Sequence, residues 1–135
     1  MISTRGRYAI RVMIDIAQNQ LDGYVPMKDV ASRQGLSLKY LEQILPALTK
    51  NKIVEGIQGK GGGYRLLRKP EEYTIGEILR VTELDLAPVS CLAEGAEKCE
   101  RRDKCQTIEF WEGLNKVVNE YLDSKTLSDL INAKK

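Results

Sequence analysis

Residues 27–50, MKDVASRQGLSLKYLEQILPALTK, contain two short amphipathic stretches on either side of a glycine. Apolar residues recur every three or four positions in both stretches, which predicts helices over 27–34 and 38–50. Gly35 suits a left-handed residue just past the first helix, and Ser37 suits the N-cap of the second. The residues expected to face inward are Met27, Val30, Ala31, Leu38, Leu41, Ile44, Leu45 and Leu48. This pattern is typical of a helix-turn-helix, and an ordinary helical hairpin is the alternative.

Two β-rich runs follow the second helix. IVEGI (53–57) and YRLL (64–67) predict a pair of strands, and the loop QGKGGG lies between them. A strand, a glycine-rich loop and a second strand directly after a helix-turn-helix form a winged helix. A nucleotide-phosphate loop is disfavoured, because it needs Ser or Thr after its lysine and then a helix, whereas Gly61 follows Lys60 here.

A third amphipathic helix is predicted ahead of this unit, from Arg5 to Leu21, with Ser3 or Thr4 as its N-cap. Its main apolar stripe consists of Tyr8, Ala9, Val12, Met13, Ile16, Ala17 and Leu21. Ile10 and Ile14 lie on a second face. A helix that is apolar on two faces usually has two neighbours, and one of them could be a partner subunit.

Charge is divided unevenly along the chain. Residues 1–69 carry 12 Lys and Arg against 5 Asp and Glu, a net of +7, and residues 70–135 carry 9 against 14, a net of −5. A basic first half indicates a polyanionic partner, and chance clustering on solvated faces is the alternative. We therefore expect two units, 1–69 and 70–135, with a boundary near RKPEEY.

The sequence also predicts the cellular location of the protein. No apolar run approaches the length of a membrane span, and MISTRGRYAI lacks the apolar stretch of a signal peptide. We expect a soluble, cytoplasmic protein with no membrane partner, in which the odd number of cysteines stays reduced rather than forming a disulfide framework.

The second helix of the helix-turn-helix keeps a free face after packing, formed by Lys39, Tyr40, Glu42 and Gln43. Lys can donate to guanine, Gln can pair adenine, and Glu can accept from cytosine. Glu42 would therefore discriminate between bases, or be an ordinary surface charge. Pro46 predicts a kink further along and leaves these turns undisturbed. The candidate phosphate contacts are Lys28, Arg33, Lys50, Lys52, Lys60 and Arg65, and about five such contacts would give a log–log salt slope of roughly −4 to −5.

The second half predicts two further helices. Thr74 and Glu77 form a capping box that opens a helix ending near Glu83, with Ile75, Ile78 and Leu79 inward. A longer helix is expected over 106–122, with Asp103 as its cap. Its apolar stripe consists of Ile108, Trp111, Leu114, Val118 and Tyr121, widened by Val117 and Leu122.

The second half has too few other elements to cover this stripe. We therefore expect the long helix to pack against the same helix of a second copy. A two-fold dimer also suits winged helices, which read paired half-sites on DNA.

All three cysteines, Cys91, Cys99 and Cys105, lie in one highly charged segment. The flanking charges argue against core thiols. Three thiolates in a loop can converge on a soft metal centre, either an iron–sulfur cluster or zinc, and a disulfide-forming thiol switch is a further alternative. The chain contains no histidine, so a fourth ligand would be a carboxylate, a partner group, a small thiol or water. Incomplete thiolate ligation favours a labile cluster over a structural zinc.

Several stretches together resemble the IscR/NsrR/CymR family of bacterial winged-helix regulators, and within it the IscR iron–sulfur regulators. They are STRGRYAIRVMIDIA, RQGLSLKYLEQ, GKGGGYRL, the clustered cysteines and YLDSKTLSDLI, which span nearly the whole chain. The resemblance implies a homodimeric transcription factor with a 2Fe–2S cluster that represses cluster-assembly or stress genes. It also implies that Cys91, Cys99 and Cys105 are the cluster ligands, and that Lys39, Glu42 and wing residues 58–62 contact DNA.

Three features depart from the family pattern. The first cysteine gap is seven residues instead of five, and Ile108 stands where the IscR regulators have a histidine ligand. The fourth ligand and the cluster type therefore stay open. Gln58 stands where an arginine often enters the minor groove, so reading of groove width there would be weaker.

The expected fold is mainly α with a small β-wing: a winged helix-turn-helix domain followed by a long C-terminal dimerisation helix. The expected DNA contacts are Lys28, Ser37, Lys39, Tyr40, Glu42, Gln43, Gln58, Lys60 and Gly61. The expected function is repression at a palindromic operator, and not catalysis. The alternatives are a cluster-free thiol or cysteine-metabolism regulator that binds DNA and a metabolic enzyme, an interaction protein, and an electron carrier, which would need no wing.

Overall fold

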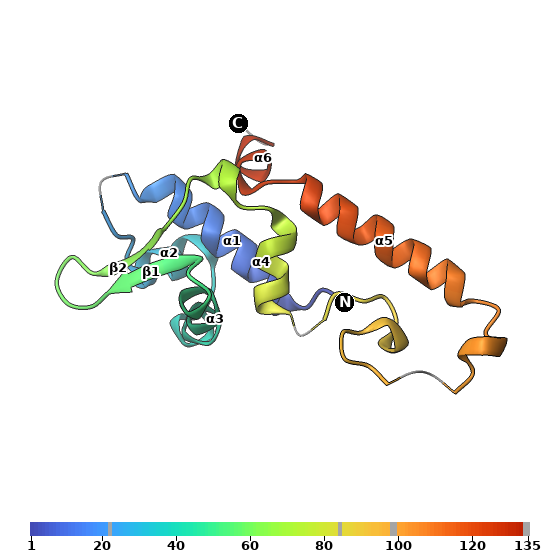
Figure 1. Cartoon of the computed structure of the whole chain (residues 1–135). Helices are drawn as coiled ribbons and strands as arrows, with labels where there is room; N and C mark the ends of the chain where they lie inside the picture. Colours follow the sequence, from blue (N-terminus) through green and yellow to red (C-terminus); the bar gives the residue numbers. More distant parts are fainter. Residues whose placement is uncertain (22, 84, 98–99, 134–135) are drawn as a thin grey trace.

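A computed structural model describes residues 1–21, 23–83, 85–97 and 100–133 of the chain. The elements are α1 (Thr4–Asn19), α2 (Met27–Gln34), α3 (Leu38–Lys50), β1 (Val54–Ile57), β2 (Gly63–Leu66), α4 (Ile75–Thr82), α5 (Ile108–Ser124) and α6 (Leu127–Asn132). Short 3-10 turns lie at Pro70–Glu72, Ser90–Leu92 and Arg102–Lys104. The fold is mainly helical with one two-stranded antiparallel sheet, which confirms the predicted class (Figure 1).

The helix-turn-helix has the bounds that its sequence predicts. Gly35 ends α2 in the left-handed region, with φ of 66°, and its N–H donates to the carbonyl of Ala31. The hydroxyl of Ser37 accepts from the Tyr40 N–H at 3.0 Å and so caps α3. Helix α3 continues through Pro46 to Lys50.

The wing is a hairpin with a short extension at its base. Val54 pairs with Leu66 at one end and Ile57 with Gly63 at the other. Val25 adds a bridge to Tyr64, with N–O distances of 2.8 and 2.9 Å. Gly63 is required here, because a Cβ at this position would lie 2.2 Å from the Val25 carbonyl oxygen.

One hydrophobic core joins residues from both halves of the chain. Met13 of α1, Leu41 of α3, Ile78 of α4 and Leu127 of α6 are all completely buried in it. Helix α6, which the sequence analysis did not single out, is opened by a capping box at Thr126. The division at residue 69 stays a prediction, and α4 and α6 both pack onto the winged helix.

The N-terminus of α1 is capped by a residue from α4's end. Ser3 occupies the N-cap position, but its side chain does not cap the helix. Instead, the Glu83 carboxylate accepts from the Ser3 N–H at 2.9 Å, the Ser3 hydroxyl at 2.8 Å and the Gly6 N–H at 3.1 Å. A side chain distant in sequence therefore supplies the cap that Ser3 or Thr4 was expected to provide.

Three expectations for single elements are wrong. Leu21 is 91% exposed, because α1 ends at Asn19 and leaves it in the following turn. Leu38 is 45% exposed, because it is the first residue of α3 and precedes the buried turns. The long helix begins at Ile108, and Asp103 lies in a 3-10 turn before it instead of capping it.

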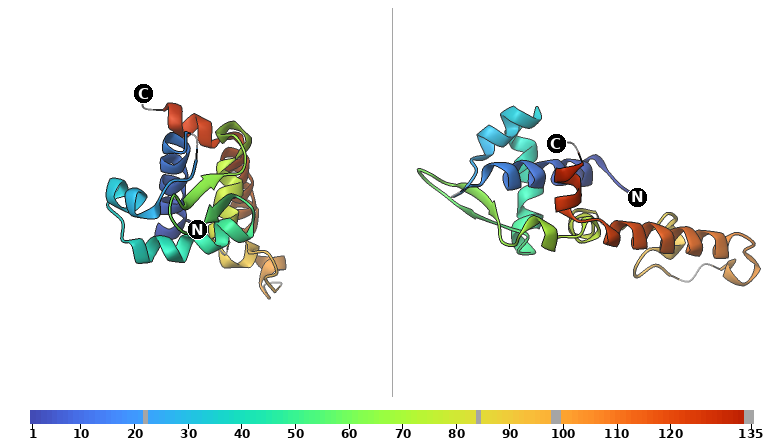
Figure 2. Two further views of the ribbon diagram at one scale, coloured as in Figure 1. Left: turned by 90° about the vertical axis from the view of Figure 1, so that its left-hand side faces the viewer. Right: turned by 90° about the horizontal axis from the view of Figure 1, so that it is seen from above.

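Helix α5 and the segment before it form an arm, defined here as residues 85–124. The arm extends from the core on the side opposite the wing, as both directions of view show (Figures 1 and 2). Among the residues of the arm that the structure describes, only Leu86 is buried. No helix in the described ranges is long and apolar enough to cross a membrane.

Candidate DNA-binding face and cysteine segment

Helix α3 presents a polar face opposite its buried one. Its inward residues Leu41, Ile44, Leu45 and Leu48 pack in the core. Lys39, Glu42 and Gln43 are exposed on the first two turns, and Lys28 is exposed on α2. The structure therefore leaves three of the predicted base contacts on one accessible face, with Ser37 at its capped end.

Tyr40, a fourth predicted contact, is only partly accessible. Its ring packs edge-to-face against Tyr8 of α1, with 5.4 Å between the ring centroids. The guanidinium of Arg11 lies 5.1 Å from the Tyr8 ring and donates to the Gln34 carbonyl. Tyr40 thus anchors the N-terminal end of α3 to α1, a role that its place in the sequence did not indicate.

A buried carboxylate holds α2 against α1. Asp15 is 2% exposed and accepts from Arg33 at 2.6 Å and from the Gln34 amide at 2.9 Å. The hydrogen bond to Asp15 is the main cause that raises the pKa of Arg33 above its usual value. Arg33 therefore stays protonated, and its positive charge is already paired with Asp15 in the free protein.

The pairing of Arg33 reduces the set of candidate phosphate contacts, and so does the ion pair between Arg65 and Glu55. The remaining four are exposed lysines that form no ion pair within the described part of the chain: Lys28, Lys50, Lys52 and Lys60. Four phosphate contacts correspond to a log–log salt slope of roughly −3 to −4 for one subunit.

The wing tip carries the other predicted DNA contacts. Gln58, Lys60 and Gly61 are exposed in the loop between β1 and β2. Gly61 has φ of 79°, in the region that favours glycine, and the Gly62 N–H closes a turn onto the Gly59 carbonyl at 2.9 Å. The glycines therefore form a tight turn that holds Lys60 at the end of the hairpin.

The cysteine segment lies along the arm. Cys91 is in the 3-10 turn Ser90–Leu92 and Cys105 directly follows the turn Arg102–Lys104. Both thiols are half-buried and unpaired, and Cys99 falls outside the described residues. Contact with the Thr107 hydroxyl, 3.4 Å from the sulfur, is the main cause that lowers the pKa of Cys105. A lowered pKa favours the thiolate, which is the form that binds metals.

Two observations bear on whether this segment could hold a metal centre. Its described donors are thiols, which suit iron–sulfur clusters and zinc. Yet no three potential ligands lie together within the described residues, 1–21, 23–83, 85–97 and 100–133. The donor chemistry therefore fits a thiolate-bound centre, while the described residues do not by themselves assemble one.

Helix α5 has no buried residue along its fully described length. Phe110 is 66% exposed, Val117 61%, Tyr121 62% and Leu114 36%. The other predicted interface residues, Ile108, Trp111 and Val118, are half-buried. Phe110, which packs edge-to-face on Trp111 with 4.9 Å between the ring centroids, is not in the predicted stripe, although it precedes Leu114 by four residues and Val117 by seven.

Comparison with protein families gives one match over nearly the whole chain. The model of the Rrf2 family, described as "Iron-dependent Transcriptional regulator", matches residues 2–133. A relative of known name, the HTH-type transcriptional regulator IscR of Pectobacterium atrosepticum, is 35% identical over 133 residues. That alignment covers 98% of this chain and 80% of the relative.

Two solved structures are similar in both fold and sequence. CymR, the global cysteine regulator of B. subtilis, superposes with a TM-score of 0.81 at 36% identity, covering 100% of this chain and 98% of that one. IscR of T. potens superposes with a TM-score of 0.75 at 35% identity, covering 100% and 88%. These relatives are named as regulators, which confirms the expected winged-helix fold and the expectation of a regulator instead of an enzyme.

Proposed function

The chain belongs to the Rrf2 family of transcriptional regulators, and we propose that it is a homodimeric repressor that senses through an iron–sulfur cluster. The observation that carries this proposal is the placement of its cysteines. All three lie in one highly charged stretch of the sequence, and the two that the structure describes, Cys91 and Cys105, are half-buried and lie outside the hydrophobic core. Relatives named IscR and a family described as iron-dependent support the same conclusion.

DNA recognition is assigned to the exposed turns of α3 and to the wing. The N-terminal turns of a recognition helix enter the major groove, where Lys39, Glu42 and Gln43 would meet base edges. Lys60 at the wing tip would meet the backbone or the minor groove. The exposed lysines around α3 supply the sequence-independent attraction.

Dimerisation is assigned to α5. Its apolar residues Ile108, Trp111, Leu114, Val118 and Tyr121 are exposed or only half-buried within the described chain. A second copy of α5 would remove this surface from water and would place two recognition helices on paired half-sites. The proposed operator is therefore palindromic.

The proposed ligands are Cys91, Cys99 and Cys105. Cys105 presents a thiol whose pKa is lowered by Thr107, and Arg102 joins the segment to α5 through an ion pair with Glu112 at 2.7 Å. These three thiolates would hold an iron–sulfur cluster, of the 2Fe–2S type in this proposal, and its presence would respond to iron supply and to oxidants. The fourth ligand is a carboxylate, a partner group, a small thiol or water, and the regulated genes would serve cluster assembly or stress.

A cluster-free thiol regulator is the second candidate. The superposition on CymR, which is named a cysteine regulator, favours it and covers almost all of both chains. In that case two of the three cysteines would form a disulfide under oxidation, and a metabolic enzyme would be the partner.

An absorption spectrum of protein purified without oxygen, with iron, sulfide and zinc analysis, separates these candidates. We expect brown protein that contains iron and sulfide in equal amounts. Cys105→Ser should lose both, whereas the control Ser90→Ala, a substitution beside Cys91, should keep both. Colourless protein with one zinc ion per chain would mean that the cysteines form a structural zinc site. Metal-free protein after attempted reconstitution would favour the thiol switch.

Selection of operators from randomised duplexes tests the DNA-binding part. We expect Glu42→Ala to relax discrimination at one base position by about tenfold, since one good contact is worth about 1–3 kcal/mol. Glu71→Ala removes an exposed carboxylate outside α3 and serves as the control. An unchanged base preference in the Glu42 variant would remove this residue from the readout.

A further inference from the structure

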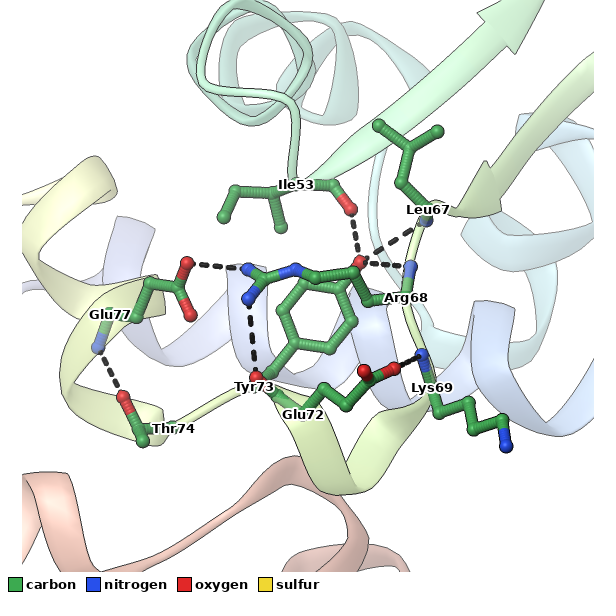
Figure 3. Close-up of polar contacts among 8 residues, drawn as sticks. All are labelled: Ile53, Leu67, Arg68, Lys69, Glu72, Tyr73, Thr74 and Glu77. Carbon is green, nitrogen blue, oxygen red and sulfur yellow. Dashed lines mark hydrogen bonds and ion pairs between the residues drawn. The ribbon is translucent and has the colours of Figure 1, made fainter.

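Tyr73 is completely buried at the junction between the wing and α4 (Figure 3). Its hydroxyl donates to the Ile53 carbonyl at 2.6 Å, directly before β1. The same oxygen accepts from the Leu67 N–H at 3.1 Å and the Arg68 N–H at 3.0 Å, directly after β2. One phenol therefore bonds to backbone groups at the base of both wing strands, and its bond to the Ile53 carbonyl is buried.

Arg68 extends this contact from the wing to α4. Its guanidinium carbon lies 4.2 Å from the centroid of the Tyr73 ring. One nitrogen donates to the Glu72 carbonyl at 3.2 Å, and another pairs with the carboxylate of Glu77. Glu77 belongs to the first turn of α4, where its backbone N–H donates to the Thr74 hydroxyl at 3.0 Å. The end of the wing is thus joined to a capped helix terminus.

Two side chains ahead of the wing also contact its strands: the Gln20 amide oxygen accepts from the Leu66 N–H at 2.8 Å, and the Tyr24 hydroxyl donates to Glu55 at 3.3 Å. A two-stranded hairpin is marginally stable by itself, so its direction is set by what holds its base. On one side the base is held by the bridge from Val25 to Tyr64, and on the other by Arg68, Tyr73 and Glu77. A small rotation at the base would displace Lys60 at the tip from a phosphate or groove edge.

We propose that Arg68, Tyr73 and Glu77, together called the wing latch, are positioning residues that set the wing relative to α3 on DNA. The inference rests on the proposed DNA binding and adds a determinant of operator preference that touches no base. Helix α4, which holds one side of the latch, is also bonded to α5, because Arg80 pairs with Asp123 at 2.6 Å and with Asn119 at 2.8 Å. The latch therefore joins the wing to the helix that supports the arm.

The latch is tested with Glu77→Gln and Arg68→Lys, which spare the buried Tyr73. Glu77→Gln makes the protein more positive, so simple electrostatics would tighten binding to any DNA. Loss of wing positioning would instead lower the ratio of operator to random-duplex affinity, by about fivefold, the lower end of what one mismatched base pair costs. Arg68→Lys keeps the charge but loses the planar fork, so it should lower the same ratio.

Glu71→Gln is the matched control. Glu71 is exposed and lies in the turn before α4, and its substitution makes the same change in net charge as Glu77→Gln. Each variant must keep a cooperative thermal transition. We expect the control to keep the wild-type ratio. Equal ratios for Glu77→Gln and Glu71→Gln would overturn the inference.

A double-mutant cycle with Lys60→Ala shows whether the latch acts through the wing tip, which it does not contact. Residues that far apart normally act independently, so any coupling must pass through wing position. We expect Lys60→Ala to weaken operator binding in the wild type and to have a smaller effect in Glu77→Gln. Equal effects in both backgrounds would overturn the latch. A wild-type protein with no operator preference would refute the proposed function itself.

Discussion

The winged helix and the arm are built from similar amphipathic helices, yet only the winged helix buries them. Helix α3 has Leu41 and Leu48 completely buried, whereas no residue of α5 is buried, although both helices carry apolar residues every three or four positions. An apolar stripe therefore shows that a helix has a neighbour. It does not show whether that neighbour belongs to the same chain.

The contacts that hold the two regions differ in kind. The winged helix shares one apolar core with α4 and α6, to which α1 and α3 also contribute. Between α4 and α5, Arg80 bonds to Asp123 and Asn119, and these groups are exposed, while Leu122 is the residue of α5 that packs against the core among those described. Exposed ion pairs contribute little stability. The winged helix is therefore held by apolar burial, whereas in our proposal a second copy and a bound group complete the arm.

The largest expected effect is on the free energy of unfolding when the core is opened. Leu127→Ala removes a completely buried side chain that joins α6 to the core, and should cost about 2–5 kcal/mol. Leu114→Ala on α5 should cost less than about 1 kcal/mol in dilute protein, because the side chain is already exposed. Urea unfolding measures both. Equal losses would mean that the arm is as integral to the fold as α6.

The second prediction concerns association. Leu114→Asp places a charge in the proposed interface and should weaken dimerisation by about 100-fold or more, since an unpaired buried charge costs several kcal/mol. Sedimentation equilibrium measures the change. Lys116→Asp adds a carboxylate at an exposed position of the same helix and should have a much smaller effect. A Leu114→Asp protein that stays dimeric would move the interface away from α5.

The sequence predicts well whatever depends on local signals. Gly35 and Ser37 mark the turn between α2 and α3, so both helices have their predicted bounds. The wing strands are found for a similar reason, because glycines separate two β-rich runs. Leu38 and Leu21 were misplaced because periodicity identifies a stripe but not the turn at which the stripe leaves the core.

Contacts between distant residues could not be predicted in this way. Tyr73 binds backbone groups at Ile53 and Leu67, and Glu83 caps α1, without any local pattern that would indicate it. The cysteines were identified as candidate ligands from their clustering and from resemblance. Their convergence on one centre stays a prediction, because Cys99 lies outside the described residues.

The third prediction tests whether polar contacts inside the winged helix matter more than those on the arm. Asp15→Asn keeps the shape of a buried side chain but leaves the Gln34 amide facing another donor, and it removes the charge that pairs with Arg33. We expect a loss of about 1–3 kcal/mol in the free energy of unfolding. Asp123→Asn breaks the exposed pair with Arg80 and should cost about 0–1 kcal/mol. Similar losses would mean that polar contacts contribute equally in the two regions.

The smallest expected effect is a pH dependence at α6. Asp129 accepts from the Thr126 backbone N–H at 2.9 Å, and this bond is the main cause that lowers the pKa of its carboxyl from 3.8. A carboxyl with a lower pKa in the folded state stabilises the protein above the unfolded pKa, and that stability is lost as pH falls through the folded pKa. Asp129→Asn should therefore lower the urea midpoint at pH 7, and the difference from wild type should shrink below pH 4.

The control is Asp103→Asn, which changes an exposed carboxyl on the arm and should leave the urea midpoint unchanged at both pH values. A difference at Asp129 that is equal at pH 7 and pH 3 would show that the carboxylate charge has no part in capping α6. A change of similar size at Asp103 would show instead that the arm contributes to the same cooperative unit as the winged helix.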